Sequence, residues 1–467
     1  MIANLGPYPE YKESGDSWLG EMPAHWSKCR IKTLLHEVDH RSDDGNGVLL
    51  SLTRSRGLIS HCDMAEKAPS TRKLTGYKRY EPGQIVMNRM QAWNGMFGAG
   101  PIVGLVSPDY AVFKVSNNHE SKFVLERLKS PDLIGQFVLE SKGIGSGFNR
   151  LYTNRFGAIP ITIPPIQEQI SIVQYIDLAT GLIDGVMRNK RKMVKLLNEQ
   201  KLAIIHQTVT RGLDPTVNFK PSDIPWHDEI PEHWVEKPLK HWARINVHTL
   251  GETTNPLYTF QYIDIGTVEA GRLVRKPAQY QFANAPSRAR RILTKGDVIV
   301  STVRTYLRAI WFVDHEPTNL IASTGFTVLS PNSDVEPEYL SYIAQDTNFI
   351  DRVVANSVGI AYPAISESAL SQLKIALPDS KEEQKRLVLH IKSQIQPYVA
   401  AISCLECEID LLHECRTRLI ADIVTGKLDV REAAARLPAE AVGSVDEVLD
   451  IDGLEDVAEF DEREVET

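Results

Sequence analysis

The chain has 467 residues, 42% of them hydrophobic, which is too long for one core and apolar enough for two globular domains with connecting structure. No run approaches the roughly 18 apolar residues of a membrane span, and the first residues lack the features of a signal peptide, so we expect a cytoplasmic protein. Five scattered cysteines favour reduced thiols, and Cys404 and Cys407 have no second ligand pair at zinc-site spacing, so no metal site is expected.

The net charge of −8 is distributed unevenly along the chain. Residues 438–467 hold twelve acidic residues and one basic residue, Arg463, and therefore contribute −11. The rest of the chain is near +3, which is compatible with a nucleic-acid partner. A block of like charge with a single aromatic residue is typical of a solvated segment, so we predict that the tail 428–467 is acidic and disordered.

Sequence motifs occur twice in the same order, which predicts a pseudo-symmetric molecule. The box Trp18–Trp26 returns 208 residues later as Trp226–Trp234, with Trp, Glu, Pro, His and Trp in register. Two predicted strands of the first globe (residues 1–165) match two of the second (residues 213–380): 82–86 with 295–299, and 107–113 with 323–329. Glu168-Gln169 matches Glu383-Gln384 at an offset of 215.

Each globe is followed by a long apolar heptad pattern, over residues 166–212 and 381–427. A narrow seam kept for many turns is what two helices need to pack lengthwise, so an antiparallel coiled coil of two helices is predicted, each roughly 65–70 Å long. The predicted seam residues are Ile172, Ile176, Ile183, Val186, Met193, Leu197, Ile204, Leu387, Ile391, Tyr398, Leu405, Leu412 and Leu419.

The repeated Trp-x-x-Glu-x-Pro-x-His-Trp boxes, the Pro-Pro-Ile-Gln-Glu-Gln sequence at 164–169 and the Val-Thr-Gly-Lys-Leu-Asp sequence at 424–429 resemble the specificity subunits of Type I restriction-modification systems. The resemblance covers roughly residues 8–436. It implies an α+β fold with two tandem pseudo-symmetric α/β target recognition domains, joined by two long helices that form an antiparallel coiled coil. Each domain would read one half of a split DNA site.

The resemblance also implies the partners and the division of labour. They are double-stranded DNA, two modification (adenine methyltransferase) subunits and restriction (ATP-dependent endonuclease) subunits, with no membrane. S-adenosylmethionine, ATP and magnesium would belong to those partner subunits, and this chain would hold neither a cofactor nor a catalytic residue.

DNA contacts are expected from cations, amides and aromatic side chains on the globes, because phosphates bind Lys and Arg while base edges need forked or planar polar groups. The candidates in the first globe are Arg72, Lys73, Tyr77, Lys78, Arg79, Arg89, Gln91, Trp93, Asn94, Asn149 and Arg150. Those in the second are Arg288, Arg290, Arg291, Arg304, Tyr306, Arg308, Asn356 and Tyr362. The alternative for each is an ordinary solvated side chain.

The box residues fit packing better than base stacking. An indole in a proline-containing box at a domain entrance is more often a packing anchor, which we predict for Trp18, Trp26, Trp226 and Trp234. His25 and His233 recur at the same place with no carboxylate or nucleophile repeated beside them in the sequence, so they are also interpreted as structural.

Two other functions remain as alternatives. The chain could be a methyltransferase or nuclease, since it has partial motifs at 255–258, at 143–147 and in Asp109 with Glu120 and Lys122, but each lacks its second part. It could also be a coiled-coil scaffold without DNA readout, although a spacer alone would not need two related globes rich in Arg, Asn, Gln and aromatics.

Overall fold

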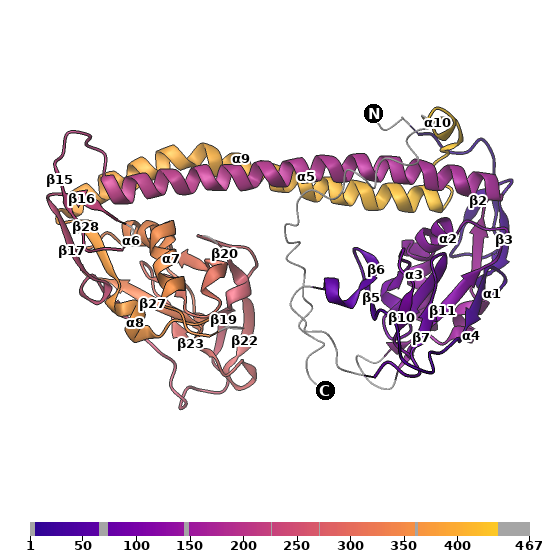
Figure 1. Ribbon diagram of the computed structural model, residues 1–467, viewed down its shortest axis with the longest axis horizontal. Coiled ribbons are helices and arrows are strands. Elements are labelled where there is room, and N and C mark those ends of the chain that lie inside the picture. Colours follow the sequence, from indigo (N-terminus) through magenta and orange to yellow (C-terminus); the bar gives the residue numbers. More distant parts are fainter. Residues whose placement is uncertain are drawn as a thin grey trace. The chain divides into compact units, whose positions relative to one another are not determined.

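The computed structural model describes residues 5–64, 73–143, 149–225, 227–269, 271–359 and 363–437. They form two compact units, the first from residues 1–189 and 408–467 and the second from residues 190–407 (Figure 1). Arg72, Trp226, Tyr362, the loop 144–148 and the acidic tail from Pro438 onward lie outside the described residues.

The first unit is built on a four-stranded antiparallel sheet in the order β4-β11-β8-β9. Its strands are β4 (Leu35–Val38), β8 (Gln84–Asn88), β9 (Phe97–Gly98) and β11 (Tyr110–Val115). Two-stranded pairs surround it: β1 (Tyr11–Glu13) with β2 (Glu21–Pro23), β3 (Ser27–Arg30) with β14 (Pro160–Ile163), β5 (Leu50–Thr53) with β6 (Gly57–Ser60), β7 (Lys78–Tyr80) with β10 (Gly104–Val106), and β12 (Lys142–Gly143) with β13 (Asn149–Arg150). The helices are α1 (Ile31–Leu34), α2 (Ser121–Leu128), α3 (Pro131–Glu140), α4 (Thr153–Ala158), α10 (Arg431–Ala435), η1 (His61–Asp63) and η2 (Ala92–Asn94). The prediction of a disordered tail from residue 428 is wrong for residues 428–437, because Val430 and Ala434 pack in the core of this unit.

The second unit repeats this sheet in the order β18-β27-β24-β25 and adds a second sheet, β22-β19-β26-β23. The strands of the first are β18 (Ala243–Ile245), β24 (Val298–Ser301), β25 (Ile310–Phe312) and β27 (Phe326–Pro331), and those of the second are β19 (Thr259–Ile263), β22 (Ala278–Gln281), β23 (Ala289–Ile292) and β26 (Leu320–Ser323). The pairs are β15 (Phe219–Pro221) with β16 (Glu229–Pro231), β17 (Trp234–Pro238) with β28 (Lys374–Pro378), and β20 (Val268–Glu269) with β21 (Arg272–Leu273). The helices are α6 (Pro337–Gln345), α7 (Thr347–Ala355), α8 (Glu367–Gln372), η3 (Leu239–His241), η4 (Ile265–Thr267), η5 (Phe282–Asn284) and η6 (Thr305–Leu307).

The repeated strands occupy equivalent places in the two units, as the sequence predicts. β8 pairs with β11 in the first unit, with Val86 opposite Val112. β24 pairs with β27 in the second, with Ile299 opposite Val328. All four of these side chains are buried, because β-branched residues pack well on a covered sheet face.

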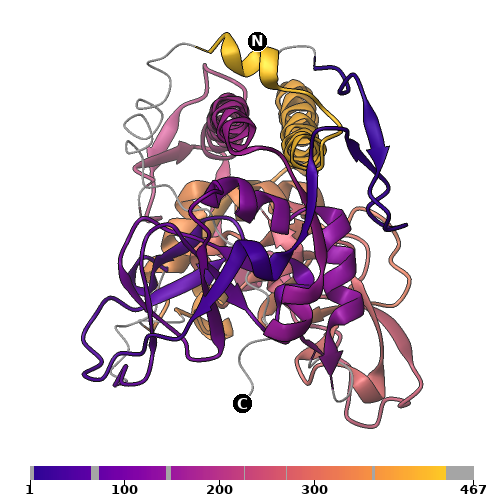
Figure 2. The ribbon, with the colours of Figure 1, turned by 90° about the vertical axis from the view of Figure 1, so that its right-hand side faces the viewer.

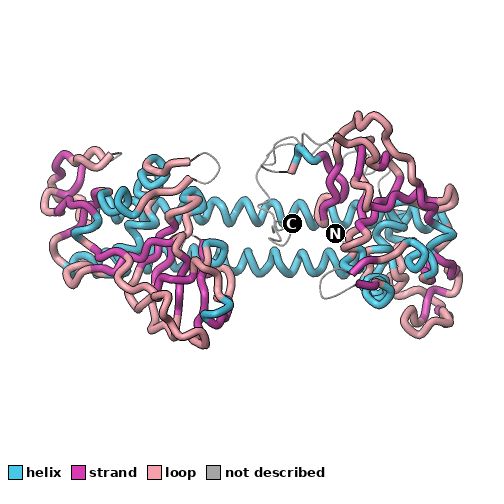
Figure 3. Tube along the Cα trace, turned by 90° about the horizontal axis from the view of Figure 1, so that it is seen from below, coloured by secondary structure: helices cyan, strands magenta, loops and turns pink. Residues whose placement is uncertain are grey.

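The two long helices, α5 (Ile166–Arg211) and α9 (Lys381–Val424), each contribute to both units. In the first unit the start of α5 shares a core with the end of α9, and Asp184 Oδ1 lies 3.1 Å from Arg416 Nε (Figure 2). In the second unit the end of α5 shares a core with the start of α9, through Ile205 and Leu387. The helices therefore pair antiparallel within each unit, and Figure 3 shows both as unbroken helices.

The strict heptad register is wrong in the middle of α5. Val186 and Met193 are 45% and 52% exposed, while Met187 is buried. An α-helix drifts about 20° per heptad, so after two heptads the buried face has turned by about 40°, close to half of the roughly 100° between neighbouring residues. Of the other seam residues, Ile172, Ile176, Ile183, Leu387 and Ile391 are buried, and Leu197, Ile204, Tyr398, Leu405, Leu412 and Leu419 are half-buried.

The helix α5 is long and apolar enough to satisfy the length and composition criteria of a membrane span. Its apolar side chains Ile172, Tyr175 and Ile176 nevertheless belong to the core of the first unit. A helix that packs in a core can be long and apolar for that reason, and it then satisfies the same criteria.

A glutamate carboxylate at the start of each long helix holds the tryptophan box of the same unit. In the first unit Glu168 Oε1 accepts hydrogen bonds from Tyr8 Oη (2.7 Å) and Trp26 Nε1 (2.9 Å), and Glu168 Oε2 lies 2.7 Å from His25 Nε2. We call this group the first anchor. Trp26 is fully buried, which confirms it as a packing residue.

The second unit repeats the arrangement, and we call this group the second anchor. Glu383 Oε1 accepts a hydrogen bond from Trp234 Nε1 (3.2 Å) and lies 3.0 Å from His233 Nε2. Trp234 is also buried. The histidines do have a repeated carboxylate beside them, supplied by the Glu-Gln motif, and the structural interpretation of His25 and His233 agrees with this geometry.

The glutamine that follows each anchoring glutamate fixes the helix that packs beside it. Gln169 Oε1 accepts the backbone N–H of Glu120 (2.9 Å), at the N-cap of α2, and Gln384 Oε1 accepts the backbone N–H of Glu336 (2.7 Å), at the N-cap of α6. An N–H at a helix start has no partner within the helix, so each bond satisfies one such donor. This explains why the Glu-Gln pair recurs.

A glycine ends each long helix against a box tryptophan. Gly212 and Gly426 have φ of 71° and 80°, the left-handed conformation common just past a helix C-terminus. A Cβ on Gly426 would lie 2.7 Å from Pro23 Cδ, and one on Gly212 would lie 3.4 Å from Trp234. Each box thus receives the start of one long helix and the end of the other.

An ion pair joins a short helix to a long helix in each unit, and the charges of the two helices are reversed between the units. Lys122 of α2 lies 2.6 Å from Asp177 of α5, and Glu338 of α6 lies 2.7 Å from Lys392 of α9. Figure 1 shows these short helices beside the long ones within their units. The positions are equivalent in the repeat, so the acid and the base have changed places.

Candidate nucleic-acid interface

Candidates from the first globe gather on the connection between β8 and β9 and on β13. Arg89, Gln91, Trp93 and Asn94 come from the connection, and Asn149 and Arg150 from β13. The backbone joins them, because the N–H of Leu151 donates to the carbonyl of Arg89 at 3.0 Å. We call these six residues the first patch.

The side chains of the first patch differ in how available they are. Asn94 and Asn149 are exposed, and Arg150 is half-buried with its guanidinium 5.7 Å from the centre of the Tyr152 ring. Arg89 is paired with Glu37, and the Trp93 indole donates to the carbonyl of Met90 at 2.8 Å. Arg150 also lies 3.7 Å from Asp109, so the two asparagines are the members best placed for an outside partner.

The second unit presents its candidates on the equivalent connection, between β24 and β25. Arg304, Tyr306 and Arg308 flank or lie on η6, and Asn356 caps the C-terminal end of α7 beside it. The two segments meet where Thr305 Oγ1 lies 3.1 Å from Ser357 Oγ. We call these four residues the second patch.

The backbone of the second patch is strained, which keeps its tip projecting. Arg304 and Arg308 have φ of 50° and 51°, a left-handed conformation that is uncommon for non-glycine residues. Arg304 is exposed, and so is Tyr306, which lies between the two arginines. Strain of this kind persists only where surrounding structure enforces it, and it clusters at functional sites.

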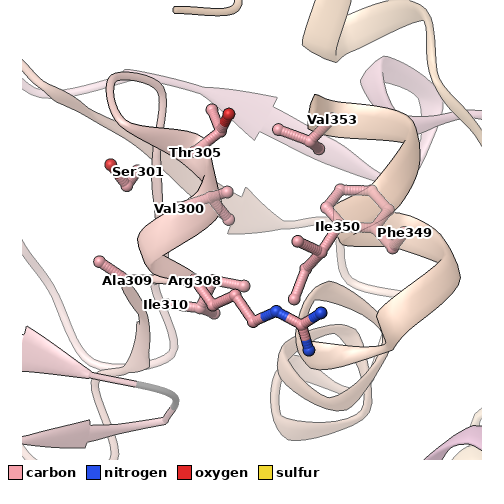
Figure 4. Close-up of a pocket in the computed structure, with 9 residues that line it drawn as sticks. All are labelled: Val300, Ser301, Thr305, Arg308, Ala309, Ile310, Phe349, Ile350 and Val353. Carbon is pink, nitrogen blue, oxygen red and sulfur yellow. The ribbon is translucent and has the colours of Figure 1, made fainter. Parts of the chain in front are cut away.

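Arg308 also lines a small cavity between η6 and α7, with Ile310, Phe349, Ile350 and other side chains (Figure 4). Its volume is about 10 Å³, room for at most one water molecule. The cavity is a packing gap, so any ligand of this patch must bind on its surface.

The remaining candidates lie on equivalent strands as well. Lys73, Tyr77, Lys78 and Arg79 lie on or just before β7, and Arg288, Arg290 and Arg291 lie on or just before β23; each strand precedes the central strand β8 or β24. Lys73, Arg79 and Arg288 are exposed, Tyr77, Arg290 and Arg291 half-buried.

Three of these cations have partners within the protein. Arg291 lies 3.7 Å from Glu367. Lys78 is buried, with its ammonium 3.5 Å from Glu37 and 3.4 Å from Asp39, and this burial argues against direct contact with DNA. Arg290 stacks over the Phe282 ring at 5.0 Å. A side chain on a strand faces either the core or solvent, and the spacing of cations alone does not distinguish the two.

The partial enzyme motifs do not form a site in the described residues. Asp109 lies 3.7 Å from Arg150, whereas Lys122 pairs with Asp177, so the nuclease-like residues face different partners. Asn255 Oδ1 accepts the backbone N–H of Leu257, as in an ordinary turn. Residues 144–147 of the glycine-rich segment lie outside the described residues.

Sequence reasoning missed Arg54 and Arg56. Both are exposed in the turn of the β5–β6 hairpin, which packs on β9 at the edge of the first patch. Thr53-Arg54-Ser55-Arg56-Gly57 carried the signal, two cations beside a turn glycine. The motif was overlooked because it contains no aromatic residue.

A family model for the Type I restriction modification DNA specificity domain matches residues 260–395, which include η6 and α7. The Type I restriction enzyme HindI specificity subunit of Haemophilus influenzae is 31% identical over 105 residues, which cover 22% of this chain and 23% of that protein. The MjaVIII specificity subunit of Methanocaldococcus jannaschii is 22% identical over 301 residues, 63% of this chain and 68% of that protein. The matched segments of this chain are therefore similar to Type I restriction enzyme specificity subunits.

A solved structure shows a further likeness, in the fold. A solved chain from work on complex assembly and conformational transition of the Type I restriction-modification system superposes with a TM-score of 0.56, over 87% of this chain and 99% of that one. Its sequence identity is 16%, so this likeness concerns the fold. The aligned segment spans less than a quarter of the Haemophilus influenzae specificity subunit.

Proposed function

We propose that this chain is the DNA sequence-specificity subunit of a Type I restriction-modification complex and that each unit reads one half of a split DNA target. The observation that carries the proposal is the equivalence of the two patches: each includes polar and cationic residues on the connection that follows the matched strand, β8 in the first unit and β24 in the second. In this proposal the chain has no catalytic residue of its own.

The chemistry of the patches suits readout of DNA. Asn and Gln can pair with adenine, Arg can form two hydrogen bonds with guanine, and cations hold phosphates. Asn94, Asn149 and Arg150 would serve the first half-site, and Arg304, Tyr306 and Asn356 the second. The side chains differ at equivalent positions, as expected for two half-sites of different sequence.

The helices α5 and α9 would keep the two half-sites at a set spacing, about one duplex turn. Four residues inserted near Gly212 add one helical turn, about 6 Å. We expect the gap in the DNA target to grow by one or two base pairs while both half-sites stay the same. A changed half-site would contradict the separation of spacer and reading units.

The proposed partners are modification subunits, two in number, restriction subunits and double-stranded DNA, in the cytoplasm. Methylation of adenine with S-adenosylmethionine, and cleavage driven by ATP with magnesium, would take place in those subunits. The specificity chain would bind the DNA and hold the catalytic subunits on it.

The experiment is to map adenine methylation across a host genome that expresses this chain with its modification subunits. The variants are Asn149→Ala in the first patch, Arg304→Ala in the second and Arg386→Ala, an exposed arginine of α9 outside both patches, as the control. We expect each patch variant to relax or abolish one half of a two-part motif and the control to leave the motif intact. An undivided motif, or a motif unchanged by both patch variants, would contradict the proposal.

A further inference from the structure

Two histidines and an aspartate from three separate segments meet in the second unit. His206 lies near the end of α5, His227 lies in the segment before β16, and Asp346 joins α6 to α7. Their ligand atoms all lie within 4.8 Å of one another. His206 Nδ1 is 2.8 Å from Asp346 Oδ1, and His227 Nε2 is 4.0 Å from Asp346 Oδ2.

Burial makes this group unusual. The Asp346 side chain is 3% exposed and that of His227 is 11% exposed. Both ring nitrogens of His227 are buried without a hydrogen-bond partner among the described residues. Buried polar atoms are nearly always paired, because an unpaired one loses its bonds to water without replacement. A ligand bound to one of these nitrogens would remove part of that cost.

The group breaks the repeat of the two units. The offsets that match the boxes and the long helices place Leu19 opposite His227 and Ala421 opposite His206. Ser130, the N-cap of α3, stands where Asp346 caps α7. All three residues are therefore replaced together in the first unit, although the anchors beside them are kept.

We propose that His206, His227 and Asp346 bind a divalent transition metal ion, with zinc as the first choice. Imidazole nitrogen and carboxylate oxygen are common zinc ligands, at 2.0–2.2 Å, and three protein ligands leave a fourth position for water. Tetrahedral geometry places such ligands roughly 3.4 Å apart, so the separations of 2.8 Å and 4.0 Å need adjustments below about 1 Å. No spacing pattern in the sequence predicts this site, because its ligands are far apart in the chain.

The bound ion would fasten the last turns of α5 to the segment that enters the second unit and to the α6–α7 junction. It would act as a structural clamp on one unit only. The proposal does not depend on DNA binding, since the three ligands belong to neither patch.

Imidazole must be neutral to donate a lone pair to a metal ion, so protons compete with the metal and we expect binding to weaken in mildly acidic solution. Arg211 near His206, and Arg352 and Asp228 near His227, are the other charged groups that influence the two rings. Arg352 is itself held by the backbone carbonyls of Asn348 and Lys374.

The test uses the full-length chain after treatment with a chelator, titrated with zinc chloride at pH 7.5 by calorimetry and by competition with a chromophoric chelator. We expect one zinc ion per chain in the wild type and at least a hundredfold weaker binding in His227→Ala and in His206→Ala. The matched control is His315→Ala, which removes an exposed histidine paired with Asp314 at 2.7 Å. It should bind zinc as the wild type does.

Two further measurements keep the result independent of folding defects. Circular dichroism and melting of each metal-free variant establish that it is folded. His227→Ala removes a ring that makes no hydrogen bond to another described residue, so the fold does not depend on such a bond. Zinc should slow hydrogen exchange at the end of α5 and the α6–α7 junction in the wild type alone. Failure of the folded wild type to bind zinc stoichiometrically, or equal binding by folded His227→Ala, would overturn the proposal.

Discussion

The two anchors allow the same substitution to be compared at equivalent places in one chain. Replacing Glu168 with alanine leaves the Trp26 indole N–H and the Tyr8 hydroxyl without their acceptor, and both side chains are buried. A buried donor left unpaired costs about 1–3 kcal/mol. We therefore expect Glu168→Ala to lower the free energy of unfolding of the first unit by about 2–6 kcal/mol.

The same change at Glu383 should cost less, about 1–3 kcal/mol. Glu383 accepts from one indole, at 3.2 Å, and its side chain is 21% exposed, compared with 7% for Glu168. Water can therefore replace part of what the second anchor loses. The conservative change Glu168→Gln keeps an acceptor for one donor and should cost less than Glu168→Ala.

Hydrogen exchange by mass spectrometry on the intact chain is the suitable assay, because two units need not unfold in one transition and a single melting temperature would mix them. We expect Glu168→Ala to speed exchange in β3 and β14, and Glu383→Ala to speed it, by a smaller factor, in β17 and β28. The reasoning would be refuted if Glu383→Ala had the larger effect, or if Glu168→Gln were as damaging as Glu168→Ala.

Three other variants test separate parts of the account. Arg304→Ala should weaken DNA binding by about 1–3 kcal/mol in a fluorescence anisotropy titration, and unchanged affinity would remove Arg304 from the second patch. Lys122→Glu should destabilise the first unit by up to about 1 kcal/mol in urea unfolding, and adding Asp177→Lys should restore most of it; additive losses would deny the pairing. Burial alone would raise the pKa of Asp132, but its partner Arg127 holds that pKa below its ordinary value. The ionised carboxylate therefore stabilises the fold at pH values above the ordinary pKa. This stabilisation is lost as the pH falls through the pKa of Asp132 in the folded protein. Urea unfolding from pH 6 down to pH 3 should therefore decline less steeply for Asp132→Asn, and equal slopes would contradict this.

The repeat is why so much of the fold could be predicted from sequence. Strands 82–86 and 295–299 carry too little information separately, but their recurrence in order before a matched helix predicts one topology used twice, and β8 and β24 occupy that place in identical sheets. The bounds of α5 could be predicted because Glu168 and Gln169 make hydrogen bonds at its start and Gly212 adopts a left-handed conformation at its end. Register was less readable, since 3.5 and 3.6 residues per turn diverge gradually and misplace Val186 only after two heptads.

Partners that come together from distant segments could not be read from spacing. Lys78 is buried beside Glu37 on β4 and Asp39 just after it, and no residue near Lys78 in the sequence indicates those acids. Likewise His25 and Glu168 are contacts 143 residues apart in sequence. The tryptophan box and the Glu-Gln motif both occur twice in the sequence. Two motifs that repeat together are candidates for a contact with each other.

The comparison of the units separates what holds the fold from what differs between the halves. The anchors, the glutamine bonds and the terminal glycines are present in both units, and each satisfies a buried donor or a close approach that the shared backbone imposes. The patches share a backbone position but not side chains: Asn94 stands on the first connection and Arg304 and Tyr306 on the second. A requirement of folding would constrain both connections alike, because the sheets beneath them are the same. Side chains that vary on a fixed frame are therefore the part of each unit free to be matched to a different ligand.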